Sequence, residues 1–255
     1  MQYHLNTLGV INPHIRFISG GVVRIKYYTL VISLLFSISV SAITVDKMVI
    51  IPNESDAKSD IKITNPASYP VFLKVTLSEL NSDNETVEFK TDEFQNWPVY
   101  VERNEFLVEP EEEIVIAIQH LAKQLNKASD RDRIIAIDIM PESVIDDGQV
   151  GQKMSILIGY RVWMIIAKDG ALKGEPSVLK TEKGYVLNNA SDSVAIFNIN
   201  LCETEFKKGT ECKGSEFVLS GKEKALNLLE FKNGNANISI RDPYDRYLIK
   251  ETIKL

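Results

Sequence analysis

Short runs of alternating apolar and polar residues follow one another along the chain, which is the pattern of half-buried β-strands. Residues 59–64 place Ile61 and Ile63 on one face of an extended segment, and residues 71–80 alternate in the same way. Turn residues such as Asn65-Pro66 separate the runs. Regularly spaced strands with turn signals between them predict an all-β protein of the sandwich type. Further strands are predicted at 43–51, 106–108, 114–118, 134–140, 184–187, 193–201, 216–219, 225–231, 236–241 and 246–255, and one or two helical turns within 120–128.

The stretch 154–166 differs from the other runs, because it is apolar on both faces when extended. One face carries only apolar or aromatic side chains, which are Met154, Ile156, Ile158, Tyr160, Val162, Met164 and Ile166. The other face mixes the two kinds and carries Ser155, Gly159 and Arg161, but also Leu157, Trp163 and Ile165. Such a strand must be covered on both faces. We therefore expect either a central strand of the sandwich core or a strand that something outside the chain completes.

The first 42 residues have the composition of a removable export signal. Arg24 and Lys26 precede a short apolar core at 30–38, and Val40-Ser41-Ala42 is a small-residue cleavage site. The apolar core is shorter than the roughly 20 residues that span a bilayer. Residues 1–42 contain three basic residues and no acidic one, so the net charge of −6 becomes −9 in the mature chain. We expect such an acidic chain neither to bind nucleic acid nor to be inserted in a membrane.

The 213 residues after the signal are enough for two sandwich domains of about 100 residues each. The best boundary between them is the polar stretch from Lys168 to Pro176, which holds two glycines and a proline. The sequence thus predicts one domain at 43–168, which includes the apolar stretch, and a smaller one at 169–255.

Few residues of the mature chain carry reactive chemistry. Cys202 and Cys212 are ten residues apart, and in an exported chain they are expected to form a disulfide that closes a hairpin. A metal site built on the two cysteines would lack further ligands nearby. His120 is the one histidine left after processing, and no Ser-His-Asp or multi-histidine zinc arrangement can be assembled around it. We therefore expect no catalytic residue, no metal and no cofactor.

Several separate segments fall in an order that a known family shares. In the first predicted domain they are Ile43-Thr-Val-Asp-Lys47, Ile61-Lys-Ile-Thr-Asn65 followed by Pro70, Leu107-Val-Glu-Pro110, and Asp130-Arg131-Asp132 before Ile134–Ile139 and Pro141-Glu142. In the second they are Leu201-Cys202 to Glu211-Cys212-Lys213 and then Leu219-Ser-Gly-Lys222. In these segments the chain resembles the PapD-like periplasmic chaperones of chaperone–usher pilus assembly, which have two immunoglobulin-like domains. The second set is similar to their alternate, common-pilus class.

The resemblance implies a non-enzymatic chaperone of the periplasm that binds pilin subunits and delivers them to an outer-membrane usher. In this family the strand that matches 154–166 is lent to a pilin whose own fold lacks a strand, and this mode is called donor-strand complementation. On the simplest register the inserted side chains would be Met154, Ile156 and Ile158, with Tyr160 near the cleft end of the segment.

The sequence departs from the best-known branch of the family at the residues that hold the client. There an Arg on the first strand and a Lys on the donor strand bind the C-terminal carboxylate of the pilin. The matching positions here are Val49 and Trp163, but Lys47 and Arg161 stand two residues earlier on the same faces. Either the anchor has shifted to Lys47 and Arg161, or this class holds its client differently and both residues are ordinary exposed charges.

Two other classes of function remain open on the sequence. A structural protein of the cell surface, such as a pilin or an adhesin, would also be a β protein, although a complete second domain at 169–255 disfavours a pilin. A periplasmic enzyme that uses carboxylates alone would need two of them about 5–10 Å apart in a cleft. Asp138 or Asp146 could serve, but no spacing singles them out. Self-association of the free protein through its edge strands is also left open.

The export signal and the cysteine pair give the first testable prediction. We expect the protein recovered from the periplasm to begin at Ile43 and to contain the oxidised Cys202–Cys212 pair, because an oxidising compartment favours the disulfide. Intact mass spectrometry with and without a thiol-alkylating reagent measures both features. A mass that retains residues before Ile43, or two thiols that react in the native protein, would contradict it.

Overall fold

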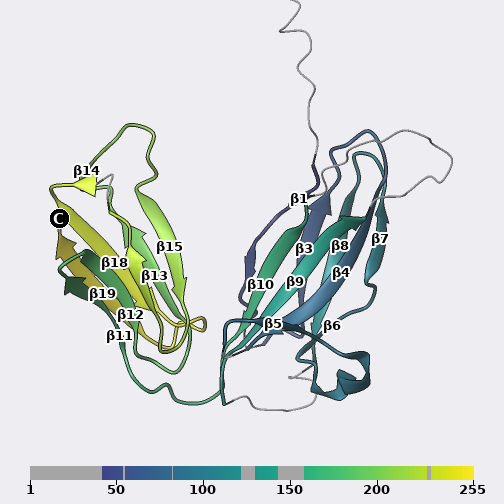
Figure 1. Ribbon diagram of the computed structural model, residues 1–255, viewed down its shortest axis with the longest axis horizontal. Helices are drawn as coiled ribbons and strands as arrows, with labels where there is room; N and C mark the ends of the chain where they lie inside the picture. Colours follow the sequence, from purple (N-terminus) through teal and green to yellow (C-terminus); the bar gives the residue numbers. More distant parts are fainter. Residues whose placement is uncertain (1–41, 54, 82, 122–129, 143–157, 229–230) are drawn as a thin grey trace, which may run out of the picture. The chain divides into compact units, whose positions relative to one another are not determined.

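The computed structural model describes residues 42–53, 55–81, 83–121, 130–142, 158–228 and 231–255. Strands and turns make up most of this part of the chain, and a 3₁₀ helix, η1 (Thr91–Asn96), is the exception (Figure 1). The predicted all-β class is therefore confirmed. Within the same residues no helix is long and apolar enough to cross a membrane.

The strands up to residue 166 form the two sheets of an N-terminal sandwich (Figure 1). A four-stranded sheet has the order β1 (Thr44–Val45), β3 (Lys58–Thr64), β8 (Glu113–His120) and β6 (Val99–Val101). A six-stranded sheet runs through β2 (Val49–Ile50), β10 (Tyr160–Ile166), β9 (Arg133–Glu142) and β4 (Val71–Leu80), and both β5 (Thr86–Glu88) and β7 (Glu105–Val108) pair with β4.

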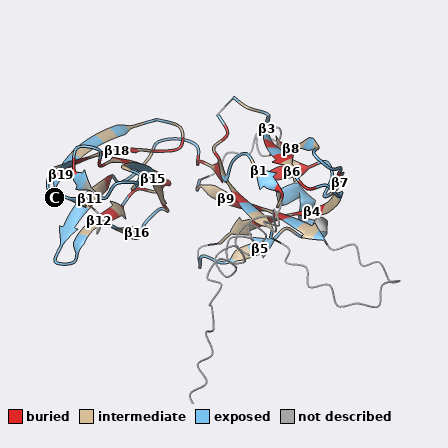
Figure 2. Cartoon of the chain, turned by 90° about the horizontal axis from the view of Figure 1, so that it is seen from above, coloured by how far each residue is buried: buried red, intermediate tan, exposed pale blue. Residues whose placement is uncertain are grey.

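The alternation that predicted the strands also decides which side chains are buried. Ile61 and Ile63 of β3 are fully buried, whereas Lys62 between them stays on the surface. β9 contributes Ile135, Ile137 and Ile139 to the same hydrophobic core (Figure 2). Burying one such side chain stabilises the fold by roughly 1.5–3 kcal/mol, so these rows hold the two sheets together.

The segment 43–51, predicted as one strand, is divided between the two sheets. Its first half, β1, pairs antiparallel with β3, and its second half, β2, pairs parallel with β10. At the switch the backbone N–H of Asp46 donates to the carbonyl of Lys62 (3.1 Å), and the Asp46 carboxylate accepts the Lys62 N–H (2.9 Å). Alternation in the sequence is the same on both sides of this switch, so it could not reveal the change of sheet.

The strands after residue 175 form a separate C-terminal sandwich (Figure 1). One sheet contains β11 (Pro176–Thr181), β12 (Gly184–Asn189) and β16 (Glu223–Leu226). The facing four-stranded sheet has the order β15 (Lys213–Val218), β13 (Ala195–Asn200), β18 (Asn235–Arg241) and β19 (Leu248–Lys254), and a small ribbon joins β14 (Glu205–Phe206) to β17 (Phe231–Lys232). Phe197 is fully buried in the core of this domain.

The predicted disulfide is confirmed, since Cys202 and Cys212 are bonded to each other. The bond joins the chain just after β13 to the chain just before β15. Beside it the backbone N–H of Leu201 donates to the carbonyl of Cys212 (2.7 Å). The pair therefore closes the end of two strands that are direct neighbours in the sheet.

The sequence did not predict the short strands β5, β6, β11 and β14. Each lies at an edge of its sheet or in a small ribbon, although β6 buries Val99 and Val101 in the core. His120, assigned to the predicted helical turn, instead closes β8 by pairing with Val99. Edge strands of this kind are defined by the partner they meet rather than by their own alternation.

One buried asparagine in each domain ties a loop to a neighbouring strand. The Asn65 side chain is fully buried, and its amide group donates to the carbonyls of Tyr69, Val108 and Glu109 at 2.9–3.1 Å. Its Oδ1 accepts the N–H of Ala67 (3.0 Å). Asn189 has the corresponding role in the C-terminal domain.

We expect Asn65→Ala to lower the free energy of unfolding by roughly 2–4 kcal/mol, because it leaves several buried backbone groups without partners. Chemical denaturation measures the change. Asn96→Ala is the matched control, since Asn96 is exposed at the end of η1 and should change stability by less than about 0.5 kcal/mol. Equal stability of the two variants would show that the Asn65 hydrogen bonds contribute nothing net.

Candidate functional site

β10 is the strand on which the candidate site depends, because its two edges are paired unequally. On one side β9 accompanies it over its whole length, from Tyr160 opposite Ile139 to Ile166 opposite Arg133. On the other side β2 pairs with it only at Trp163 and Met164. The beginning of β10 is therefore an edge of the sheet.

The direction of the backbone groups follows from the pairing with β2. The N–H of Trp163 donates to the carbonyl of Met48 (2.9 Å) on the β2 side. Because N–H and C=O groups of alternate residues point to the same side of a strand, those of Arg161 and Gly159 point to this side too. Among the residues that the structure describes, no strand pairs with them there. Such a row can accept an added strand.

Two of the four predicted donor residues belong to the described part of the chain and two do not. Met154 and Ile156 lie outside the described residues. The Ile158 side chain is 54% exposed. Tyr160 is partly buried against the N-terminal core, and its hydroxyl donates to the carbonyl of Ile43 (2.7 Å).

Beyond Tyr160 the same face of the strand belongs to the core of the protein itself. Val162 and Met164 are fully buried in the N-terminal hydrophobic cluster. The central-strand interpretation is therefore right for this half of the stretch. Exposure changes at Tyr160, which is where the described strand begins.

Gly159 leaves room for a side chain of the neighbouring strand β9. A Cβ at this position would come within 2.1 Å of the Met140 sulfur and 3.0 Å of the Ile139 carbonyl oxygen. The Met140 side chain, 46% exposed, therefore lies across the backbone of Gly159. A larger residue at position 159 would therefore have to displace the Met140 side chain.

The structure pairs the positions that the family comparison aligned, since Trp163 lies opposite Val49. Two residues earlier, Arg161 makes a bidentate ion pair with Asp138, from Nε to Oδ1 (2.6 Å) and from Nη2 to Oδ2 (2.8 Å). Its guanidinium also lies 5.5 Å from the centre of the Trp163 ring. The hydrogen bonds that Arg161 donates to Asp138 raise the pKa of its guanidinium, so this side chain is a permanent cation.

Lys47 also has a carboxylate partner within the molecule. Its Nζ lies 3.2 Å from the Oδ2 of Asp46, and the Lys47 side chain is 41% exposed. Burial raises the pKa of Asp46, but the N–H of Lys62 and the ammonium of Lys47 lower it below its usual value as the net result. An external carboxylate at either predicted anchor would therefore compete with an aspartate that is already there.

The structure brings together one pair that the sequence did not suggest. The buried His120 places Nε2 3.1 Å from the hydroxyl of Ser59, and its Nδ1 lies 2.8 Å from the carbonyl oxygen of Asp56. Its backbone N–H donates to Ala57 (2.9 Å). The orienting group is a backbone carbonyl, and the contacts to Asp56 and Ala57 fix the loop between β2 and β3.

No carboxylate pair of the described chain stands out as catalytic. Asp138, one of the two candidates, is held by Arg161 as a bidentate partner. Asp146, the other, lies outside the described residues. The same part of the chain holds no cluster of three or more His, Cys, Asp or Glu side chains that could bind a metal ion.

Comparisons with known proteins support this description of the N-terminal domain. The sequence model of the CS5 fimbrial protein N-terminal domain matches residues 45–167. These residues include every strand of the N-terminal sandwich from β2 to β10 and the last residue of β1. No curated protein sequence matches the chain.

Solved structures match the two-domain fold. A structure of the SafA pilin in complex with the SafB chaperone from Salmonella enterica is 13% identical, with a TM-score of 0.53 over 85% of this chain and 97% of the other. The E. coli chaperone DraB is 11% identical, with a TM-score of 0.50 over 84% of this chain and 98% of the other. The prediction of two immunoglobulin-like sandwich domains is thus confirmed. The N-terminal domain is thus similar to the CS5 fimbrial protein N-terminal domain over residues 45–167, and the chain has the fold of the PapD-like chaperones of the chaperone–usher class.

Proposed function

We propose that the protein is a periplasmic chaperone that binds pilin subunits by donating the strand that leads into β10, and that it delivers them to an outer-membrane usher. The observation that carries the proposal is the open edge of β10. Its backbone groups at Gly159 and Arg161 face a side without a described partner strand, next to the exposed Ile158. This edge lies within the segment that matches the fimbrial family, 45–167.

Addition of a strand at this edge would combine two kinds of contact. Main-chain hydrogen bonds supply affinity that depends little on sequence, and alternate side chains fill pockets and set the register. In an extended segment Met154, Ile156 and Ile158 would share the face that continues into the core as Tyr160 and Val162. Each inserted apolar side chain would contribute roughly 1.5–3 kcal/mol to the complex.

Lys47 and Arg161 are proposed as the anchor for a carboxylate of the client. Both are cations beside the parallel pairing of β2 and β10. Each is more than two-fifths exposed and paired to an aspartate. In this proposal the client carboxylate replaces Asp46 and Asp138 as the partner, so it gains only the difference between two similar interactions.

The cellular setting is part of the same proposal. Residues 1–42 would direct export and be removed, and the periplasm would then oxidise the cysteine pair. Residues 43–168 would form the domain that holds the client, and 169–255 the second domain. Pilin subunits and the usher are the proposed partners, and no enzymatic activity is proposed.

We expect Ile158→Asp to leave the melting temperature unchanged and to abolish co-purification with a co-expressed pilin subunit. Ile158 is exposed in the free protein, whereas a charge in an apolar pocket of the client would cost several kcal/mol. Val162→Asp is the matched control on the same face, because Val162 is fully buried in the protein's own core. That variant should lose its folded state.

Two outcomes would argue against the donated strand. Normal pilin recovery with Ile158→Asp would show that this side chain does not enter the client. A melting temperature that falls as far as in Val162→Asp would place Ile158 in the core, and the proposed mechanism would fail.

The anchor is tested by Lys47→Gln and Arg161→Gln. Because the client carboxylate only replaces an aspartate as the partner, each replacement should weaken pilin binding by at most about fivefold, which corresponds to roughly 1 kcal/mol. Lys62→Gln is the matched control, since Lys62 is also exposed and ion-paired but lies on β3. Titration of purified chaperone with pilin, with melting curves alongside, makes the comparison. Affinities equal to that of the Lys62 variant would remove both residues from the site.

A further inference from the structure

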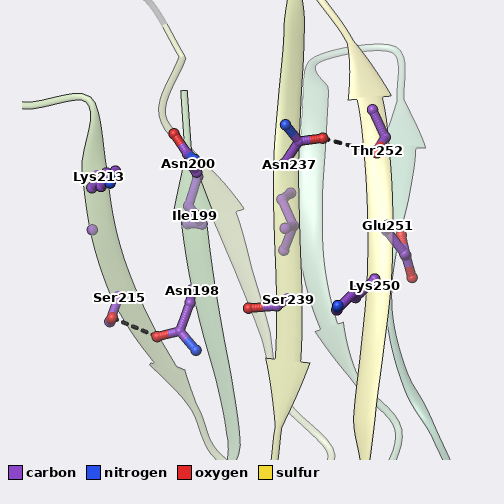
Figure 3. A pocket seen from close by; sticks show the side chains of 12 residues that line it. Asn198, Ile199, Asn200, Lys213, Ser215, Asn237, Ser239, Lys250, Glu251 and Thr252 are labelled. Atoms are coloured by element: carbon purple, nitrogen blue, oxygen red, sulfur yellow. Dashed lines mark hydrogen bonds between the residues drawn. The ribbon is translucent and has the colours of Figure 1, made fainter. Parts of the chain in front are cut away.

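The outer face of the C-terminal four-stranded sheet carries a hollow of about 670 Å³. The hollow contains no residue of the proposed client strand. Its floor is made of side chains from β15, β13, β18 and β19, which Figure 3 shows side by side. Directly opposed residues of the four strands form a polar row of Lys213, Asn200, Asn237 and Thr252. The apolar residues between them, such as Ile199, turn into the core.

A second polar row lies beside the first. Register places Ser215, Asn198, Ser239 and Lys250 opposite one another across the same four strands. The two rows therefore end in a lysine at opposite edges of the sheet, one on β15 and one on β19 (Figure 3). Between the lysines every side chain of the rows is a carboxamide or a hydroxyl.

The carboxamides use their carbonyl oxygens inside the protein. Oδ1 of Asn200 accepts the backbone N–H of Cys202 (3.1 Å), and this donor fixes which way the amide points. Oδ1 of Asn198 accepts from the hydroxyl of Ser215 (2.8 Å). The amide N–H groups of both asparagines are left for a ligand.

The third carboxamide, Asn237, differs, because both its oxygen and its amide nitrogen have partners in the protein. Oδ1 of Asn237 accepts from the hydroxyl of Thr252 (3.0 Å), and its amide nitrogen lies 3.4 Å from a carboxylate oxygen of Glu203. Glu251 is the carboxylate that lines the hollow, but its side chain turns away and accepts the N–H of Val178. In the part of the chain that is described, Lys213 and Lys250 have no ion-pair partner.

Among the described residues the rows thus leave the amide N–H groups of Asn198 and Asn200 and two ammonium groups for a ligand, on a mature chain of net charge −9. The complement of these donors is a ligand rich in acceptors and negative charge. A protein partner fits poorly, because binding energy between proteins concentrates in aromatic, Arg and large apolar anchors, and these rows hold none. Donors that repeat at the strand spacing of about 4.8 Å suit a polymer whose units repeat their acceptors.

We propose that this face binds a linear glycan that carries uronic acid carboxylates. The two lysines pair with carboxylates at the ends of the bound stretch, and the amides of Asn198 and Asn200 donate to hydroxyl, ring and carboxylate oxygens between them. The site is independent of the proposed client strand, because it lies wholly on the C-terminal sheet.

The test titrates the full mature chain with tetragalacturonate, and with neutral chitotetraose as the matched uncharged glycan. Calorimetry should detect binding of tetragalacturonate and no binding of chitotetraose. In ¹⁵N-resolved NMR spectra the side-chain amide signals of Asn198 and Asn200 should shift during the titration. Lys213→Gln and Lys250→Gln should each weaken binding about tenfold, as expected for the loss of a charge-assisted contact.

Lys183→Gln is the control for net charge, because Lys183 is exposed in the turn between β11 and β12 of the other sheet. It should leave the affinity unchanged. The proposal is overturned if tetragalacturonate does not bind, if chitotetraose binds as well, or if Lys183→Gln has the effect of the other two variants. Tighter binding of hexaglutamate than of tetragalacturonate would assign the face to an acidic protein partner instead.

Discussion

The unequal pairing of β10 is the constraint on which the rest of the N-terminal domain depends. Backbone groups of a strand need partners on both edges, or water, or another chain. β9 satisfies one edge, but β2 reaches only Trp163 and Met164 on the other. It reaches no further because the Asp46–Lys62 hydrogen bonds keep the preceding residues on β3. The place where the first strand changes sheets therefore decides how much of β10 stays open.

Much of this fold could be predicted from residue patterns, since alternation directly encodes burial. Ile61 and Ile63 are in the core because polar neighbours flank them, and Ile135, Ile137 and Ile139 of β9 are in the core at the same spacing of two residues. The sheet switch at Asp46 could not be predicted, because it depends on register with β3 and β10, which lie far away in the sequence. Short edge strands such as β11 could not be predicted for a similar reason. Pairing with β12 defines β11, whereas its own residues show no clear periodicity.

In the candidate site, too, alternation could be read from the sequence, whereas features that depend on strand register could not. Sequence alone indicated that Lys47 and Arg161 lie on matching faces of two strands, and it indicated an apolar row from Met154 onward. It could not show that Asp138 stands opposite Arg161, because that neighbour is set by the register of β9 and β10. Nor could it separate Val162, which the protein buries itself, from Ile158, which it exposes. One apolar face thus has a part that packs in the protein's own core and a part that stays exposed. Only the packing in the structure distinguishes the two parts.

The aspartates beside the basic residues change what an anchor could contribute. A client carboxylate that takes the place of Asp138 exchanges one exposed ion pair for another, and such pairs are worth at most about 1 kcal/mol each. The gain in affinity is therefore small, but the exchange requires a carboxylate at one distance from the inserted side chains. A client shifted by one residue would turn its apolar side chains away and leave Asp138 in place. On this argument Arg161 selects the register of the client, while the apolar row and the open backbone edge supply the binding energy.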